Sequence, residues 1–182
     1  RYEGETTAYV DGIAASAATG KQVVVITDSV AQAPIGTTFT ASTVPVVLAE
    51  AFLSDEFSMT GTGTNQGNTG ADQNALVVSA AGATHPLGAG FAAGSVTTSS
   101  SATVTHGWGK PTANAVVAAT ITGDTTKAAI YGYDTGAAMQ GGYTAPARRV
   151  GFHLYNGSSS VLNDNSVALF DAAIAWAAKS AP

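Results

Sequence analysis

The chain has 182 residues, a net charge of −5, and only 10% charged against 45% hydrophobic residues. This composition excludes intrinsic disorder, which needs low hydrophobicity with high net charge, and phosphate-tracking nucleic-acid binding, which needs many cations. No run of about 18 apolar residues suggests a membrane span, and the absence of cysteine excludes disulfides and thiolate chemistry. At this length we expect a single domain over residues 1–182.

The first part of the chain predicts a parallel pair of strands. Residues 7–10 are a short strand candidate, and residues 22–27 are continuously apolar and β-branched, which is typical of a strand buried on both faces. Pro34 limits any helix within residues 29–39 to a broken or late-starting one. Residues 45–49 are the second buried strand. Two such strands joined by a helix-length connection predict a βαβ unit.

The second part of the chain predicts antiparallel hairpins. Residues 60–70 are polar and glycine-rich, lack the spacing of a phosphate-binding loop, and predict a surface loop. The strand candidates that follow are separated by Gly and Pro turns at spacings of about 8–12 residues, which favours hairpins. They are residues 75–79, 94–98, 102–106, 115–122 and 127–133. A last strand over 148–154 and a closing helix over 166–179, with capping residues at 163–165, complete the chain.

Several segments, taken in chain order, resemble a known family. They are residues 23–27, 45–50, 59–61, 85–90, 128–131, 148–152 and 175–178. Together they resemble the flavodoxin-like domains related to the trehalose-utilisation proteins and the class I glutamine amidotransferases, which also occur as modules of secreted bacterial proteins. The resemblance covers residues 6–178. It implies a flavodoxin-like three-layer α/β sandwich with a mainly parallel sheet, to which the second half adds antiparallel hairpins.

Two departures from the family pattern affect what the resemblance implies. The amidotransferases use a cysteine nucleophile, and this chain has no cysteine, so their mechanism is not carried over. Members of the group also begin with a strand and helix before the strand matched to residues 7–10, and that first strand lies at the sheet centre. A neighbouring copy or a cleaved N-terminal piece is therefore expected to supply it. The alternative is that residues 7–10 are the first strand of a reduced sheet.

Candidate catalytic residues stand at predicted strand ends. Asp28 and Glu50 follow the two parallel strands and Asp134 follows a later strand, so their carboxylates are expected to converge on one edge, as a glycosidase-like pair requires. All three are equally explained as helix caps or turn residues. The histidines form no metal-binding motif, and His153 alone is a catalytic candidate, because the resemblance places histidines near this ligand-binding edge. The alternative is a hydrogen-bonded structural histidine. No cofactor or metal is expected.

Aromatic residues suggest a carbohydrate ligand. Trp108, Tyr131, Tyr133 and Tyr155 are candidates for a platform on which a sugar ring stacks. Core packing and subunit interfaces use the same residue types, so both readings stay open.

The neutral composition gives the leading functional prediction. Abundant Ser, Thr, Ala and Gly with little charge are typical of exported bacterial surface and filament proteins, whose copies pack without like-charge repulsion. Residues 1–4 lack the apolar stretch of a signal peptide, so an exported chain is seen in processed form. We therefore expect a non-enzymatic, extracellular or cell-surface subunit that forms a homo-oligomer or filament, without nucleic acid. The alternatives are a carbohydrate-binding module of a secreted protein and a diverged trehalose-utilisation-like hydrolase.

Overall fold

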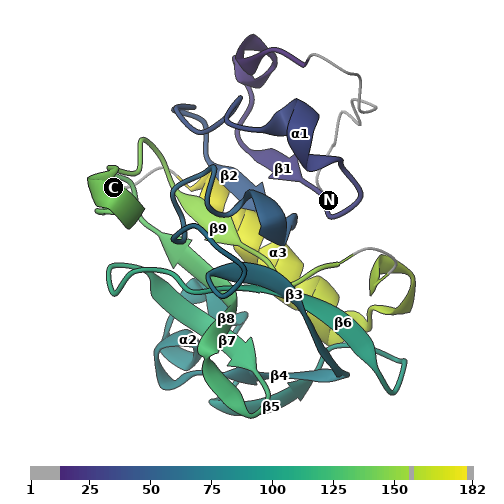
Figure 1. Ribbon diagram of the computed structural model, residues 1–182. Helices are drawn as coiled ribbons and strands as arrows, with labels where there is room; N and C mark the ends of the chain where they lie inside the picture. Colours follow the sequence, from purple (N-terminus) through teal and green to yellow (C-terminus); the bar gives the residue numbers. More distant parts are fainter. Residues whose placement is uncertain (1–12, 156–157, 180–182) are drawn as a thin grey trace.

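All the strands of the computed structural model, which describes residues 13–155 and 158–179, belong to one sheet (Figure 1). The strands are β1 (Val24–Ile26), β2 (Val46–Leu48), β3 (Gly67–Gln73), β4 (Ala75–Val78), β5 (Gly94–Thr97), β6 (Val104–Gly109), β7 (Val116–Ile121), β8 (Asp124–Tyr133) and β9 (Arg149–Gly151). The α-helices are α1 (Gln32–Ile35), α2 (Ala80–Thr84) and α3 (Asp164–Ala178). Short 3-10 helices are η1 (Ala15–Ala18), η2 (Ala51–Leu53), η3 (Pro86–Gly88), η4 (Gln140–Gly142) and η5 (Ser158–Val161).

The sheet is mixed and mostly antiparallel. Its main path runs β1-β2-β9-β8-β7-β4-β5, while β6 joins β8 and β3 joins β6. Only β1–β2 and β2–β9 are parallel pairs. The other six pairings among the described strands are antiparallel. β2 is hydrogen-bonded on both sides, so the described sheet has no vacant position between its first strands.

The predicted flavodoxin-like three-layer sandwich with a mainly parallel sheet is therefore wrong, and the resemblance to the trehalose-utilisation and amidotransferase group does not hold for this fold. Parallel neighbours need a crossover connection of a dozen or more residues, usually a helix. The connection from β7 to β8 is instead a tight turn at Gly123, whose φ of 80° favours glycine. α3 is the one long helix among the described residues.

Several local predictions are confirmed. β1 and β2 are parallel, with Val24 opposite Val46, and the connection between them carries the short α1 rather than a full helix. The hairpin pattern of the second half is also confirmed. The prediction of a loop over 60–70 is wrong in part, because β3 begins at Gly67 and pairs with β6. Residues 7–10 lie outside the described residues.

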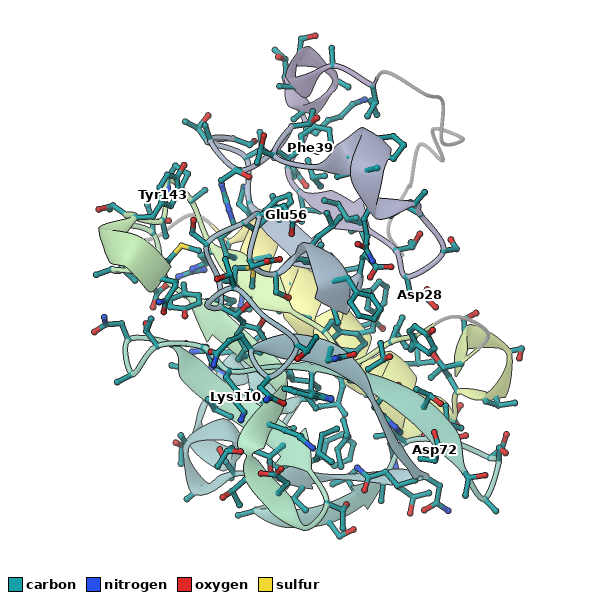
Figure 2. All side chains as sticks on the ribbon, viewed as in Figure 1. Asp28, Phe39, Glu56, Asp72, Lys110 and Tyr143 are labelled. Atoms are coloured by element: carbon teal, nitrogen blue, oxygen red, sulfur yellow. The ribbon has the colours of Figure 1, made fainter. Side chains whose placement is uncertain are left out.

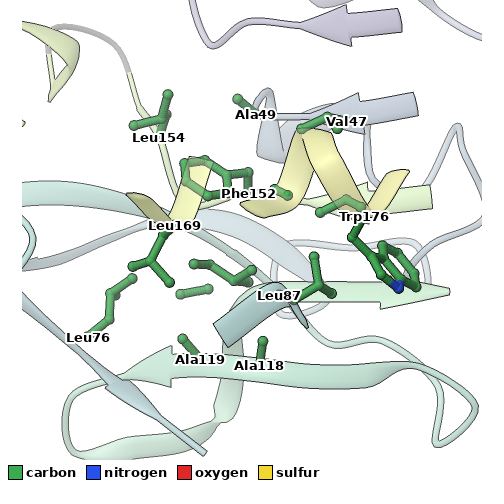
Figure 3. Packing of buried hydrophobic residues seen from close by; sticks show 14 of the residues in the cluster. Val47, Ala49, Leu76, Leu87, Ala118, Ala119, Phe152, Leu154, Leu169 and Trp176 are labelled. Carbon is green, nitrogen blue, oxygen red and sulfur yellow. The ribbon is translucent and has the colours of Figure 1, made fainter. Parts of the chain in front are cut away.

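β2 shows why a continuous apolar run marks a strand covered on both faces. Val46 and Leu48 point into one hydrophobic cluster, beside Phe57 and Met59. Val47, between them, points into the other cluster, where α3 supplies Leu169 and Trp176 (Figure 3). All three β2 side chains are at most 1% exposed. The sheet therefore has a core on each face.

α3 confirms the predicted closing helix, and both of its ends are held by side chains. At its start, the Asn163 side chain accepts a hydrogen bond from the backbone N–H of Ser166 at 3.2 Å. At its end, Nη1 of Arg148 donates to the carbonyl oxygens of Trp176 and Lys179, both at 2.7 Å. These bonds satisfy terminal carbonyl groups that the helix itself leaves unpaired. Neither α3 nor any other described helix has the length and apolar character needed to cross a bilayer.

Candidate functional site

Three of the predicted site residues, Asp28, Glu50 and His153, follow the carboxyl ends of the three parallel strands. Ile26, Leu48 and Gly151 share one register across β1, β2 and β9. Asp28, Glu50 and His153 each lie two residues beyond these positions. The strand register thus supports the predicted convergence for Asp28 and Glu50. It does not support it for Asp134, because β8 runs antiparallel to β9 and Asp134 lies at the opposite end, beside Arg148.

The two carboxylates interact but have distinct surroundings. Glu50 is 5% exposed, and its Oε1 accepts a hydrogen bond at 3.0 Å from the backbone N–H of Phe52, which caps η2. Burial raises the pKa of Glu50, and the charge of Asp28 raises it further, against the effect of the Phe52 bond. Burial also raises the pKa of half-buried Asp28. Glu50 thus caps η2, as one alternative held, and its pKa also depends on the charge of Asp28.

The enclosed space near η2 is small, and neither Asp28 nor Glu50 is among the residues that line it. A cavity of about 10 Å³ lies beside η2 and the ends of β2 and β9, lined by Leu48, Ala51 and Gly151 among others. That volume holds no more than a single water molecule. The cavity therefore does not admit a sugar or another organic substrate.

His153 is enclosed rather than presented to a ligand. It is 1% exposed, and its Nε2 lies 3.1 Å from the hydroxyl oxygen of Ser166, which is itself fully buried. Its ring lies 5.1 Å from that of His106 and 4.6 Å from that of Phe152. Burial, helped by His106, lowers the pKa of His153 to about 3. The spacing of a histidine base and serine nucleophile is present, but the pair lies inside the molecule, where it ties α3 to the end of β9.

His106 is a buried partner that the sequence reasoning did not single out. Its Nδ1 lies 2.9 Å from the carbonyl oxygen of Val104, which only accepts hydrogen bonds, so Nδ1 carries the proton. Its Nε2 lies 3.4 Å from the Thr98 hydroxyl oxygen. Both histidines of the stack are therefore hydrogen-bonding groups of the core.

Acid is expected to destabilise the protein through His153. Its pKa falls from an ordinary 6.5 to about 3 on folding, so between these pH values the unfolded chain binds a proton that the folded chain does not. The stability is fully present above pH 6.5 and is lost as the pH falls, by on the order of 3 kcal/mol at pH 4. Urea denaturation between pH 7 and 4 measures this loss.

The matched variants are His153→Gln and His85→Gln. His153→Gln is expected to flatten the pH dependence of the free energy of unfolding. His85 is half-buried, its ring accepts a hydrogen bond from the N–H of Leu87 at 3.2 Å, and its replacement is expected to keep most of that dependence. An equally steep acid loss in His153→Gln would contradict the assignment.

A second acidic pair, Asp55–Glu56, was missed at the sequence level. Burial raises the pKa of Glu56 to about 7, helped by a hydrogen bond with Asp55. Its Oε2 is buried and has no hydrogen-bond partner among the described atoms. The only signal was that these are the one pair of directly adjacent acids in the sequence. Figure 2 labels Glu56 and Asp28 on the same half of the molecule.

The aromatic candidates are mostly core residues. Trp108, Tyr131 and Tyr133 are all at most 7% exposed, and only Tyr155 is half-buried. The Tyr133 hydroxyl donates to the carbonyl oxygen of Met59 at 2.8 Å. The structure therefore does not bring the four rings together on an exposed face. A glycan ligand stays a prediction.

Within the described ranges, no group of three or more His, Asp or Glu side chains is placed to hold a metal ion. The chain matches no known protein family, no curated protein and no solved structure.

Proposed function

We propose that the chain is a non-enzymatic structural module, exported to the cell exterior, that self-associates through the open edge of its sheet at β1. The observation that carries this proposal is the unpaired side of that strand. In the described part of the chain, β1 pairs with β2 and with no strand beyond it.

The backbone geometry of β1 leaves donors and acceptors facing outward. Val24 N–H donates to the carbonyl oxygen of Pro45 at 2.9 Å, and the Ile26 carbonyl accepts from the N–H of Ala49 at 2.8 Å. Alternate residues of a parallel strand turn their peptide groups to opposite sides, so those of Val25 face the open edge. The Val25 side chain is 37% exposed. The edge thus offers hydrogen bonds and an apolar contact together.

Nothing in the local sequence blocks the addition of another strand. Residues 22–27 contain neither a charged residue nor proline, which are the usual means of protecting an edge. At the opposite edge, the side-chain amides of Asn163 and Asn165 donate to the carbonyl oxygen of Thr97 in β5, at 3.0 and 2.9 Å. That edge is partly covered. β3, which also has a single partner, carries the charged Asp72. These contrasts favour β1 as the edge at which a neighbouring copy adds a strand.

The surface composition supports the same proposal. With 10% charged residues, against about 25% in an average soluble domain, identical copies meet little like-charge repulsion. A chain that pairs with its own copies at a sheet edge benefits directly from such a surface.

A lysine at the open edge is expected to abolish assembly. Sedimentation velocity over a concentration series should show growing species for the unaltered chain and a monomer for Val25→Lys, because the charge would be buried against the added strand. Val167→Lys is the matched control, since Val167 is the other exposed large hydrophobic side chain among the described residues and lies on α3. A monomeric unaltered chain, or equal assembly by both variants, would contradict the proposal.

A further inference from the structure

A groove of about 370 Å³ lies at the end of the parallel strands opposite to Asp28 and Glu50. Its walls are the residues that precede β1, β2 and β9, together with the last residues of α3. They include Lys21, Val44, Ala147, Arg148 and Lys179. Its volume is within the range of sites that hold small organic ligands, roughly 300–1,000 Å³.

The charge of this groove is unlike that of the chain as a whole. Lys21, Arg148 and Lys179 line it, which is three of the seven Lys and Arg residues in a chain of net charge −5. No Asp or Glu is among its described lining residues. Asp134 bonds to Nε of Arg148 at 2.9 Å from outside the lining and offsets one of these charges. The described lining residues of the groove thus carry positive charge and no negative charge.

A fourth cation lies behind the groove wall. Arg149 is fully buried, and its guanidinium donates to the carbonyl oxygens of Ala147 and Arg148, both at 3.1 Å, and of Val44 at 3.4 Å. All three of these residues line the groove. Carbonyl oxygens repel anions, and here they are already occupied by a positive group. The wall is therefore more favourable to an anion than its backbone alone would be.

The end of α3 is arranged in the same way. Its terminal carbonyls carry the negative end of the helix dipole, which would disfavour an anion in the groove. Arg148 Nη1 already donates to the carbonyl oxygens of Trp176 and Lys179, which offsets this negative end. The Arg148 guanidinium also lies over the Trp176 ring, with its central carbon 4.7 Å from the ring centre. Exposed Lys21 and Lys179 then approach the groove from different elements.

We propose that this groove binds a small multivalent anion through its carboxylate or phosphate groups. Binding in this groove does not depend on the proposed self-association, because the groove is lined by the residues before β1 and not by the open edge of β1. The ammonium groups of Lys21 and Lys179 pair with the anionic groups of the ligand. Arg148 and Arg149 make the electrostatic potential of the groove wall positive.

The test is titration at low ionic strength with citrate and with inorganic phosphate, followed by calorimetry and by backbone amide shifts. Citrate and phosphate separate a polycarboxylate from a phosphate ligand by their relative affinities. Binding of either is expected to shift the amides of Thr135, Ala177 and Ala178, to weaken with added salt, and not to occur with neutral glucose.

Two double variants distinguish binding in the groove from nonspecific attraction of anions to positive charge. Lys21→Gln with Lys179→Gln is expected to weaken binding on the order of tenfold. Lys110→Gln with Lys127→Gln removes the same charge from the face of Trp108, where the two ammonium groups lie 6.0 and 4.9 Å from the ring centre, and is expected to leave binding unchanged. No binding of either anion, or an equal loss in both double variants, would overturn the proposal.

Discussion

Replacing Gly82 by alanine is expected to lower the free energy of unfolding by about 3 kcal/mol, or to prevent folding. Gly82 lies in α2, which packs directly on β7. A Cβ atom at this position would meet the carbonyl group of Ala118 and lie only 2.8 Å from its Cα. β7 is hydrogen-bonded to β4 and β8, so its backbone cannot yield as a side chain would by changing rotamer.

Gly88 takes part in the same close backbone packing, and Gly61 is the control position for both glycines. A Cβ on Gly88, in η3, would meet the carbonyl group of Gly82, so Gly88→Ala is expected to be similarly destabilising. Gly61→Ala would meet only the flexible side chain of Gln66, at 3.3 Å, and is expected to change stability by less than about 1 kcal/mol. Urea denaturation followed by circular dichroism measures all three. A Gly82→Ala variant as stable as Gly61→Ala would contradict this packing.

Arg149→Met is the second substitution with a large expected effect, a loss of about 3–5 kcal/mol. The fully buried guanidinium also donates to the carbonyl oxygens of Thr40 at 3.1 Å and Ser42 at 2.6 Å, on the segment between α1 and β2. Burial lowers its pKa to about 10, so it stays charged at neutral pH. Methionine fills much of the volume but leaves these carbonyl groups without their donor.

The control for Arg149→Met is a substitution that removes a positive charge from the surface. Lys21→Met removes the same charge at an exposed position and is expected to change the free energy of unfolding by less than about 1 kcal/mol. Chemical denaturation at pH 7 compares the two variants. Equal stability of Arg149→Met and the unaltered chain would show that the segment over residues 40–44 does not depend on the guanidinium.

The local strands were predictable because a strand that is buried on both faces is continuously apolar in sequence. Residues 22–27 and 45–49 are continuously apolar because β2 is covered on both faces, and the βαβ interpretation gave their parallel pairing correctly. The closing helix was predictable from its cap at Asn163.

The sheet as a whole was not predictable, because pairing depends on residues far apart in the chain. β3 is polar and glycine-rich, and it is a strand only because β6 supplies its hydrogen bonds. The resemblance to flavodoxin-like domains rested on short segments that report local structure. Such segments do not determine whether later strands join in parallel or in antiparallel fashion.

The candidate site was predictable in position but not in environment. The rule that parallel strands end at one edge placed Asp28, Glu50 and His153 together. The partners of His153 are Ser166 and His106, which other elements bring to it. Their enclosure depends on the packing of α3, which no local pattern records.

Amide hydrogen exchange at β1 tests most directly the claim that this edge joins copies of the chain. In a dilute monomeric sample, the Val25 amide is predicted to exchange rapidly, while the Val24 amide, bonded to Pro45, is protected. In a concentrated, assembled sample, the Val25 amide is predicted to become protected as well. A Val25 amide that still exchanges rapidly in the assemblies, or that is already protected in the monomer, would contradict the account.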